Sequence, residues 1–146
     1  MNVFKYLNKV YGPFSVDLFA SNLTKKANKF YTKYFCEGTA GVDAFTYDWE
    51  LECCWVMPPP TLIARTIDHM KTCKAHGIMV IPKWMSSAYW PIIHDVEQYA
   101  WGIQLVSEYK NPKQFVTACQ FGNNIFTEGQ FASNVVVLAV DFRQRL

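Results

Sequence analysis

The stretch from Cys53 to Ile81 constrains the fold more than any other part of the chain. It opens with the apolar run CCWVM, breaks at three consecutive prolines, and resumes with apolar residues at helical spacing. A second apolar run, IMVIP, follows. Proline lacks the backbone donor that a sheet requires, so the first strand must end at Met57. Strand, helix and strand within this length predict a βαβ unit, in which a right-handed crossover joins two parallel strands.

The helix inside this unit is predicted to begin at Thr61, whose hydroxyl can cap it, and to close at Gly77. The strand after it is predicted over Ile78–Trp84. One side of the helix is apolar and consists of Leu62, Ile63, Ile67, Met70 and Cys73.

Patterns on either side of this unit extend the α/β layout. Apolar spacing predicts a helix over Val3–Val10, and Phe14–Ala20 is a predicted buried strand. Residues 21–35 are interpreted as a short helix or an irregular loop, and residues 37–49 as a loop with one short strand. The further predicted elements are a helix over Ser86–Ala100 interrupted at Pro91, strands over 102–109 and 114–121, a loop over 123–133, and a last strand over Asn134–Phe142 buried on both faces.

Length and composition agree with a single domain over residues 1–146. The chain has 51% hydrophobic residues and a net charge of +2, which excludes a disordered chain and indicates no particular partner. Its five cysteines form no CxxC pair, so we expect reduced thiols, no metal site, and an intracellular protein of the nucleus or cytoplasm. No apolar run approaches a membrane span of ~20 residues. The predicted class is α/β, with a mostly parallel sheet.

Few residues carry a recognisable chemical motif. No phosphate-binding glycine loop occurs, and the histidines at 69, 76 and 94, all on predicted helices, lack metal-ligand spacing. Ligands of open α/β sheets bind at the carboxyl ends of the strands. The candidate turns are therefore those at DLFAS, VMPPP and IPKW, at the ends of the first, second and third predicted strands. Asp17 lies within an apolar strand, so it is either a structural anchor for a neighbouring turn or a ligand contact.

The segment KKANKFYTKY combines four lysines with three aromatic residues. Such a segment can neutralise phosphates and stack on bases, which favours nucleic acid as a partner. The alternative is a solvated helix face whose aromatic rings turn inward. The expected nucleic-acid-binding residues are Lys25, Lys26, Lys29 and Lys33, with Lys83 and Trp84 from the string IPKW.

The order of the strings DLFAS, KKANKFYT, DAFTYDW, VMPPP and IPKW resembles the phage-type DNA N-6-adenine methyltransferase (Dam-like) family. It is most similar to the degenerate form of this domain in polyproteins of DIRS-type, tyrosine-recombinase retrotransposons. The resemblance implies a Rossmann-like, S-adenosylmethionine-dependent methyltransferase fold. It places Asp17, Ala20, Ser21, Asp43 and Asp48 at the cofactor, and Met57, Pro58, Pro59 and Pro60 at the catalytic tetrapeptide.

The tetrapeptide departs from the family pattern Asn-Pro-Pro-Tyr at both ends. A thioether is a weak hydrogen-bond acceptor, so Met57 cannot orient a target amino group. Pro60 has no ring to stack on a flipped base. We therefore expect a pseudoenzyme that binds DNA or RNA or other retroelement polyprotein domains, with S-adenosylmethionine binding retained or lost. The alternatives are an active DNA adenine methyltransferase with an atypical MPPP motif, and an assembly domain.

Overall fold

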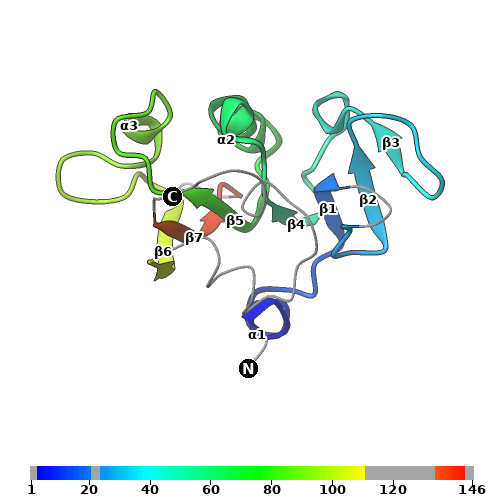
Figure 1. Ribbon diagram of the computed structural model, residues 1–146, viewed down its shortest axis with the longest axis horizontal. Coiled ribbons are helices and arrows are strands. Elements are labelled where there is room, and N and C mark those ends of the chain that lie inside the picture. The colour runs from blue at the N-terminus through cyan, green and yellow to red at the C-terminus, as the bar shows by residue number, and fades with distance from the viewer. Residues whose placement is uncertain (1–2, 21–23, 111–133, 144–146) are drawn as a thin grey trace.

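In the part of the chain that the structure describes, seven strands form one mixed sheet with helices on both faces (Figure 1). The computed structural model describes residues 3–20, 24–110 and 134–143. The elements in chain order are α1 (Val3–Tyr11), β1 (Val16–Ala20), β2 (Lys29–Thr32), β3 (Gly41–Val42), η1 (Ala44–Thr46), β4 (Cys53–Val56), η2 (Pro60–Leu62), α2 (Ile63–Cys73), β5 (His76–Pro82), α3 (Trp90–Ile93), β6 (Ile103–Tyr109) and β7 (Val135–Asp141).

The strands lie in the order β3-β2-β1-β4-β5-β7-β6. All neighbours from β3 to β5 pair in parallel, including the predicted pair β4 and β5. Among the strands of the described residues, only β7 runs the other way, because it pairs antiparallel with both β5 and β6. The expected mostly parallel α/β sheet is thus confirmed, and the carboxyl ends of β1, β2 and β4 meet at one edge.

Two apolar clusters hold the layers together, one on each face of the sheet. The larger lies under α2 and α3 and includes Ile67, Met70 and Trp90. The smaller lies under α1 and includes Leu7, Phe14 and Trp55. Residues of β5 and β7 alternate between the clusters and are nearly all buried, which confirms that the last strand is covered on both faces.

The ends of α2 differ from the sequence prediction. Thr61 does not cap the helix, because a turn of 3-10 helix, η2, precedes it and its N-cap residue, Leu62, makes no side-chain hydrogen bond. The helix ends at Cys73, and its C-cap residue, Lys74, takes the left-handed conformation with φ of 55°. Gly77 lies instead inside β5, where an added Cβ would come within 2.0 Å of the carbonyl oxygen of Cys54. Glycine at this position allows β4 and β5 to approach each other.

Three other expectations need correction. Residues 29–32 form the buried strand β2, which pairs with β1, so the lysine segment is not a helix. The predicted helix over Ser86–Ala100 is reduced to the four residues of α3, and Pro91 stands in its first turn rather than interrupting it. His76 begins β5 and is not helical. The expected strand over 114–121 and the loop after it lie outside the described residues.

Candidate functional site

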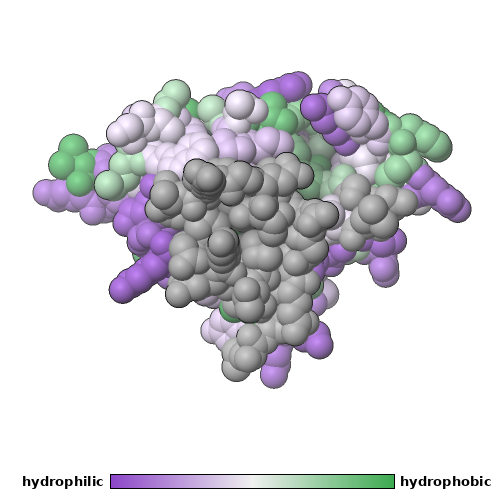
Figure 2. Space-filling model, viewed as in Figure 1, coloured by the Kyte–Doolittle hydropathy of each residue, from purple (hydrophilic) through white to green (hydrophobic). Residues whose placement is uncertain are grey.

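A cleft of about 580 Å³ opens at the carboxyl ends of β1 and β2, beside the beginning of α2. Its volume lies within the range of about 300–1,000 Å³ that small-molecule sites occupy. Figure 2 shows the surface hollowed between α2 and β2. The lining residues are Leu18, Phe19, Ala20, Thr32, Lys33, Asp43, Ala44, Phe45, Pro59, Thr61, Leu62 and Arg65. The cleft lies where open α/β sheets bind their ligands.

Asp17 anchors the turn that begins behind this cleft. Its carboxylate accepts backbone N–H hydrogen bonds from Phe19, at 3.3 Å, and from Lys26, at 2.9 Å. Burial raises the pKa of Asp17 to about 7, against the opposing effect of these two amides. Both carboxylate oxygens therefore accept hydrogen bonds from the local backbone, as expected if Asp17 is a structural anchor for the neighbouring turn. Its role toward a cofactor stays a prediction.

The segment after β3 forms one wall of the cleft. Asp43 has a left-handed backbone with φ of 65°, and its carboxylate accepts the N–H of Phe45 at 3.1 Å, which fixes the turn into η1. The indole of Trp49 is fully buried and donates to the carbonyl oxygen of Ala44 at 2.9 Å. Local hydrogen bonds therefore fix the orientation of this wall.

The other expected cofactor residues are distributed unevenly. Ala20 and Asp43 line the cleft, whereas Asp48 is exposed, accepts the N–H of Glu50 and lies outside the lining. Ser21 lies outside the described residues.

The tetrapeptide follows β4 directly, but its first side chain turns away from the cleft. Met57 is half-buried and packs against the apolar cluster under α1. Pro58 is buried, Pro59 lines the cleft, and Pro60 begins η2. The prolines thus shape the turn between β4 and α2, while Met57 contributes to the core.

The expected nucleic-acid-binding lysines of this segment lie at both ends of β2, and their binding role stays a prediction. Lys29 stands at the amino end of β2 and pairs with Glu52 at 2.6 Å. Lys25 lies over the ring of Phe30 and Lys26 over that of Phe4, both before β2 begins.

Only Lys33, at the carboxyl end of β2, reaches the cleft. It lies over the ring of Tyr34 at 5.3 Å, and Tyr34 and Phe35 are 73% and 83% exposed. Tyr34 and Phe35 follow Lys33 directly in the chain and are not among the residues that line the cleft. We call Lys33, Tyr34 and Phe35 the aromatic rim.

Lys83 and Trp84 take part in the packing of the sheet's carboxyl edge. The ammonium of Lys83 pairs with Glu108 of β6 at 3.0 Å, and Trp84 packs against the apolar cluster under α2 and α3. The first contact ties β5 to the far end of the sheet. Nucleic-acid binding by these two residues stays a prediction.

Sequence reasoning missed the pair formed by Arg65 and Phe45. The guanidinium carbon of Arg65 lies 4.0 Å from the centroid of the Phe45 ring, which is cation–π contact. Phe45 also meets Phe19 edge-on at 5.7 Å and lies 5.8 Å from Trp49. The signal available in the sequence was a lone basic residue in the first turn of the helix after the prolines.

The histidine of α2 is structural. His69 contacts the carbonyl oxygen of Tyr47 at 2.8 Å and meets the Trp49 ring edge-on at 4.2 Å. Cys73 lies 3.4 Å from the same ring nitrogen, but burial raises the pKa of its thiol, so it is not an activated nucleophile. Among the described residues, no cluster of His, Cys, Asp and Glu is arranged to hold a metal ion.

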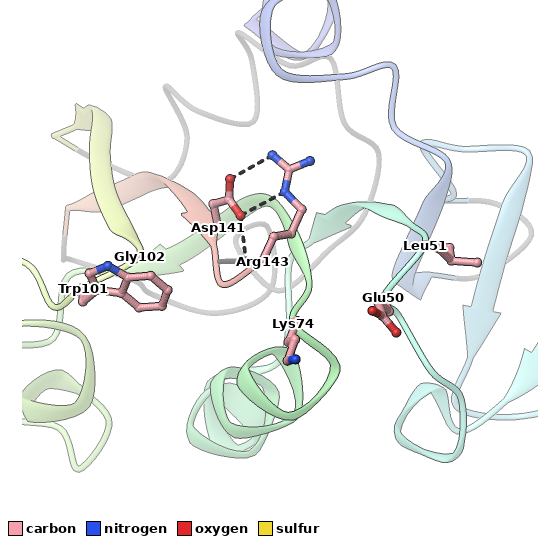
Figure 3. Close-up of a pocket in the computed structure, with 7 residues that line it drawn as sticks. All are labelled: Glu50, Leu51, Lys74, Trp101, Gly102, Asp141 and Arg143. Carbon is pink, nitrogen blue, oxygen red and sulfur yellow. Dashed lines mark hydrogen bonds and ion pairs between the residues drawn. The ribbon is translucent and has the colours of Figure 1, made fainter. Parts of the chain in front are cut away.

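A second cavity, of about 690 Å³, lies at the opposite edge of the sheet (Figure 3). It is larger than the cleft, but it opens at the amino ends of the parallel strands. Arg143 and Asp141 face each other there through two hydrogen bonds of 3.0 and 2.8 Å. Because these charges satisfy each other, we place the functional site at the smaller cleft.

The sheet order, the reversed β7 and a cleft at the carboxyl ends define an α/β methyltransferase-like domain. The chain belongs to the DNA N-6-adenine-methyltransferase (Dam) family, whose model matches residues 1–145. No curated protein matches it. In the part of the chain that the structure describes, no helix is long and apolar enough to cross a membrane.

Family membership suggests S-adenosylmethionine as the cofactor, and the cleft tests this suggestion. Its size and its apolar walls, which include Leu18 and Phe45, suit an adenosine-sized group. Its charges do not suit the donor, because among the described lining residues Lys33 and Arg65 stand against the single carboxylate of Asp43. S-adenosylmethionine itself carries two positive groups, a sulfonium and an ammonium, and one carboxylate. The cleft fits the cofactor in size and not in charge.

Proposed function

We propose that this chain is a methyltransferase-fold domain of retrotransposon origin that no longer transfers a methyl group and that binds nucleic acid. The observation that carries the loss of activity is the position of Met57. Its side chain stands first in the tetrapeptide, packs against the cluster under α1, and brings no strong acceptor to the reaction site. Loss of one preorganised hydrogen-bonding group costs about 10²–10³ in rate in well-studied enzymes.

The aromatic rim supports the nucleic-acid part of the proposal. Tyr34 and Phe35 expose most of their rings beside a cleft that has two cations on its lining. Stacking of a base on an exposed aromatic ring contributes about 1–3 kcal/mol, and lysine neutralises the adjoining phosphate. The retroelement origin is supported by the ordered strings DLFAS, DAFTYDW and IPKW. In that setting DNA, RNA or a neighbouring polyprotein domain is the partner.

An active DNA adenine methyltransferase is the second candidate, and the family match over residues 1–145 favours it. Transfer of a radiolabelled methyl group to adenine-containing DNA separates the two. We expect the wild type to transfer no more methyl groups than a Thr61→Trp variant does. Thr61 is an exposed residue of the cleft's lining, so the added indole fills the cleft. Leu51→Trp is the matched control, because Leu51 is 95% exposed at the opposite edge. Transfer by the wild type and by Leu51→Trp, but not by Thr61→Trp, would refute the loss of activity.

Filter binding tests the nucleic-acid part, with single- and double-stranded DNA and RNA across a range of salt. Lys33→Ala should weaken binding and reduce the salt slope by about one. Lys29→Ala is the matched control, because this lysine is paired with Glu52 at the other edge. Equal effects of the two changes, or no binding by the wild type, would contradict the proposal.

A further inference from the structure

The positive charge of the cleft has a definite position. Lys33 lies at the end of β2, and Arg65 lies in the first turn of α2, on another side of the lining. Within residues 3–20, 24–110 and 134–143, neither of them makes an ion pair. Asp43 is the one carboxylate among the lining residues that the structure describes, and it already accepts the N–H of Phe45. An anion with more than one negative oxygen would complement this arrangement better than a cation.

The end of β2 is where Rossmann-like sheets distinguish a free ribose from a phosphorylated one. A carboxylate near this point binds the ribose hydroxyls, whereas a basic residue accommodates a phosphate. In this chain β2 ends at Thr32, whose hydroxyl contacts that of Thr39 at 3.0 Å, and Lys33 follows directly. The position thus carries an ammonium and no carboxylate, which favours a phosphate on the sugar.

Arg65 is preorganised by its contact with Phe45. The guanidinium lies over the ring at 4.0 Å, and the ring is itself braced by Phe19 and Trp49. A guanidinium that stacks through one face keeps its N–H edge for bidentate bonds to phosphate and its other face for a base. This pair can therefore hold the base and the phosphate of one nucleotide at the same time.

We propose that the cleft binds a nucleoside monophosphate unit, with Lys33 and Arg65 on the phosphate and the Arg65–Phe45 pair beneath the base. The inference rests on the proposed loss of methyl transfer, because the cleft is then free of S-adenosylmethionine. The unit comes either from a free mononucleotide or from one nucleotide of a single strand. In the second case the aromatic rim, Lys33 with Tyr34 and Phe35, receives the neighbouring bases.

Titration calorimetry of the full chain tests the proposal. The probes are the 2′-, 3′- and 5′-monophosphates of adenosine, adenosine itself, S-adenosylmethionine, and a short single-stranded oligonucleotide with and without a 5′-phosphate. The variants are Lys33→Ala, Arg65→Ala and the charge-preserving Arg65→Lys. Lys9→Ala is the matched control, because Lys9 is an exposed lysine of α1, which packs on the other face of the sheet (Figure 1).

We expect at least one adenosine monophosphate to bind about tenfold more tightly than adenosine or S-adenosylmethionine, as charge-assisted hydrogen bonds to a phosphate require. Lys33→Ala and Arg65→Ala should each remove about tenfold of this affinity, and Arg65→Lys should restore part of it. If the oligonucleotide binds more tightly, the site is one for single-stranded nucleic acid. If the mononucleotide binds more tightly, the site is one for free mononucleotides.

Three results would overturn the inference: S-adenosylmethionine binding more tightly than every monophosphate, equal affinities for adenosine and its phosphates, or equal losses from Lys9→Ala and Lys33→Ala. Methyl transfer is measured on the same preparations, so that failure of the proposed loss of activity can be distinguished from failure of the proposed nucleotide site. Turnover by a chain that also binds the monophosphate refutes only the loss of activity. Absence of both turnover and phosphate binding refutes only the nucleotide site.

Discussion

Asp17 should make the stability of this domain fall as the pH rises from 4 to 8. Burial holds its pKa at about 7 in the folded protein, compared with 3.8 for an ordinary aspartate. Between these values the folded state keeps a proton that the unfolded state has lost, so the free energy of unfolding decreases with pH. The rise of about 3 units, at about 1.4 kcal/mol per unit, amounts to roughly 4 kcal/mol.

The direction follows from the raised pKa. The contribution is fully present below pH 3.8, is lost progressively as the pH rises, and is gone above about pH 7. Other groups act in the opposite direction: burial lowers the pKa of His76, and Arg143 lowers that of Asp141. A comparison with Asp17→Asn removes these contributions, because they are common to both proteins. Asparagine keeps the size of the side chain and does not titrate.

Urea unfolding followed by tryptophan fluorescence, at constant ionic strength, measures the difference between wild type and Asp17→Asn at each pH. The wild type should lose stability relative to the variant at up to about 1.4 kcal/mol per pH unit, and the difference should level off above pH 7. A difference that is constant from pH 4.5 to 8 would refute the reasoning. It would mean that the amides of Phe19 and Lys26 offset the burial of the carboxylate.

Three further changes test the packing that surrounds the cleft. Gly77→Ala should destabilise the domain by about 3 kcal/mol or more in urea unfolding, since its Cβ would overlap the carbonyl oxygen of Cys54. The control, Gly38→Ala, should cost only about 1 kcal/mol. Equal costs would contradict the close approach of β4 and β5. Met57→Asn should lower the free energy of unfolding by about 1–3 kcal/mol, because it places an amide against the cluster under α1. The control, Met85→Asn, changes a site that is 66% exposed and should cost almost nothing. An unchanged urea midpoint for Met57→Asn would show that the Met57 side chain does not pack there. The Lys29–Glu52 pair, with lysine 44% exposed, should contribute no more than about 1 kcal/mol in a double-mutant cycle, and a larger coupling would show that it is not a surface pair.

Much of the sheet could be predicted from hydrophobic patterns. The apolar runs at Cys53–Met57 and Asn134–Phe142 contain β4 and β7, because a strand buried on both faces leaves an uninterrupted apolar run. The run Ile78–Trp84 overlaps β5, which begins two residues earlier, at His76, and ends at Pro82. Short elements were harder. β2 covers only four residues, and the capping residues at the start of this segment suggested a short helix or an irregular loop, although pairing with β1 decides its conformation.

The helix ends were mispredicted for a similar reason. Gly77 offered the usual C-terminal signal, yet the contact between β4 and β5 requires a glycine there, and Lys74 takes the left-handed position instead. Over Ser86–Ala100, capping residues and apolar spacing suggested a long helix. The structure keeps four residues of it, because Tyr89 donates its hydroxyl to the carbonyl of Pro82 at 2.5 Å and the chain then bridges back from His94 to Tyr99.

The site was predictable in position and not in composition. The rule that ligands bind at the carboxyl ends of strands located the cleft, and the tetrapeptide stretch lies on its border. The side chains that line it depend on tertiary contacts. Arg65 and Phe45 are 20 positions apart (65 − 45), and nothing in their local patterns indicates that they stack. Lys29 and Lys33 lie at opposite ends of β2 because the segment between them is a strand and not a helical turn.

The position of β7 has a consequence for how the domain is made. This strand is the last that the structure describes, but it lies between β5 and β6, pairing with seven residues of the first and six of the second. During synthesis the sheet therefore cannot close until residues 135–141 have left the ribosome, and until then β5 and β6 have no partner between them. A proteolytic cut or a fusion joint placed before residue 135 would leave an open seam in the sheet. The same joint placed after Phe142 would leave the sheet whole.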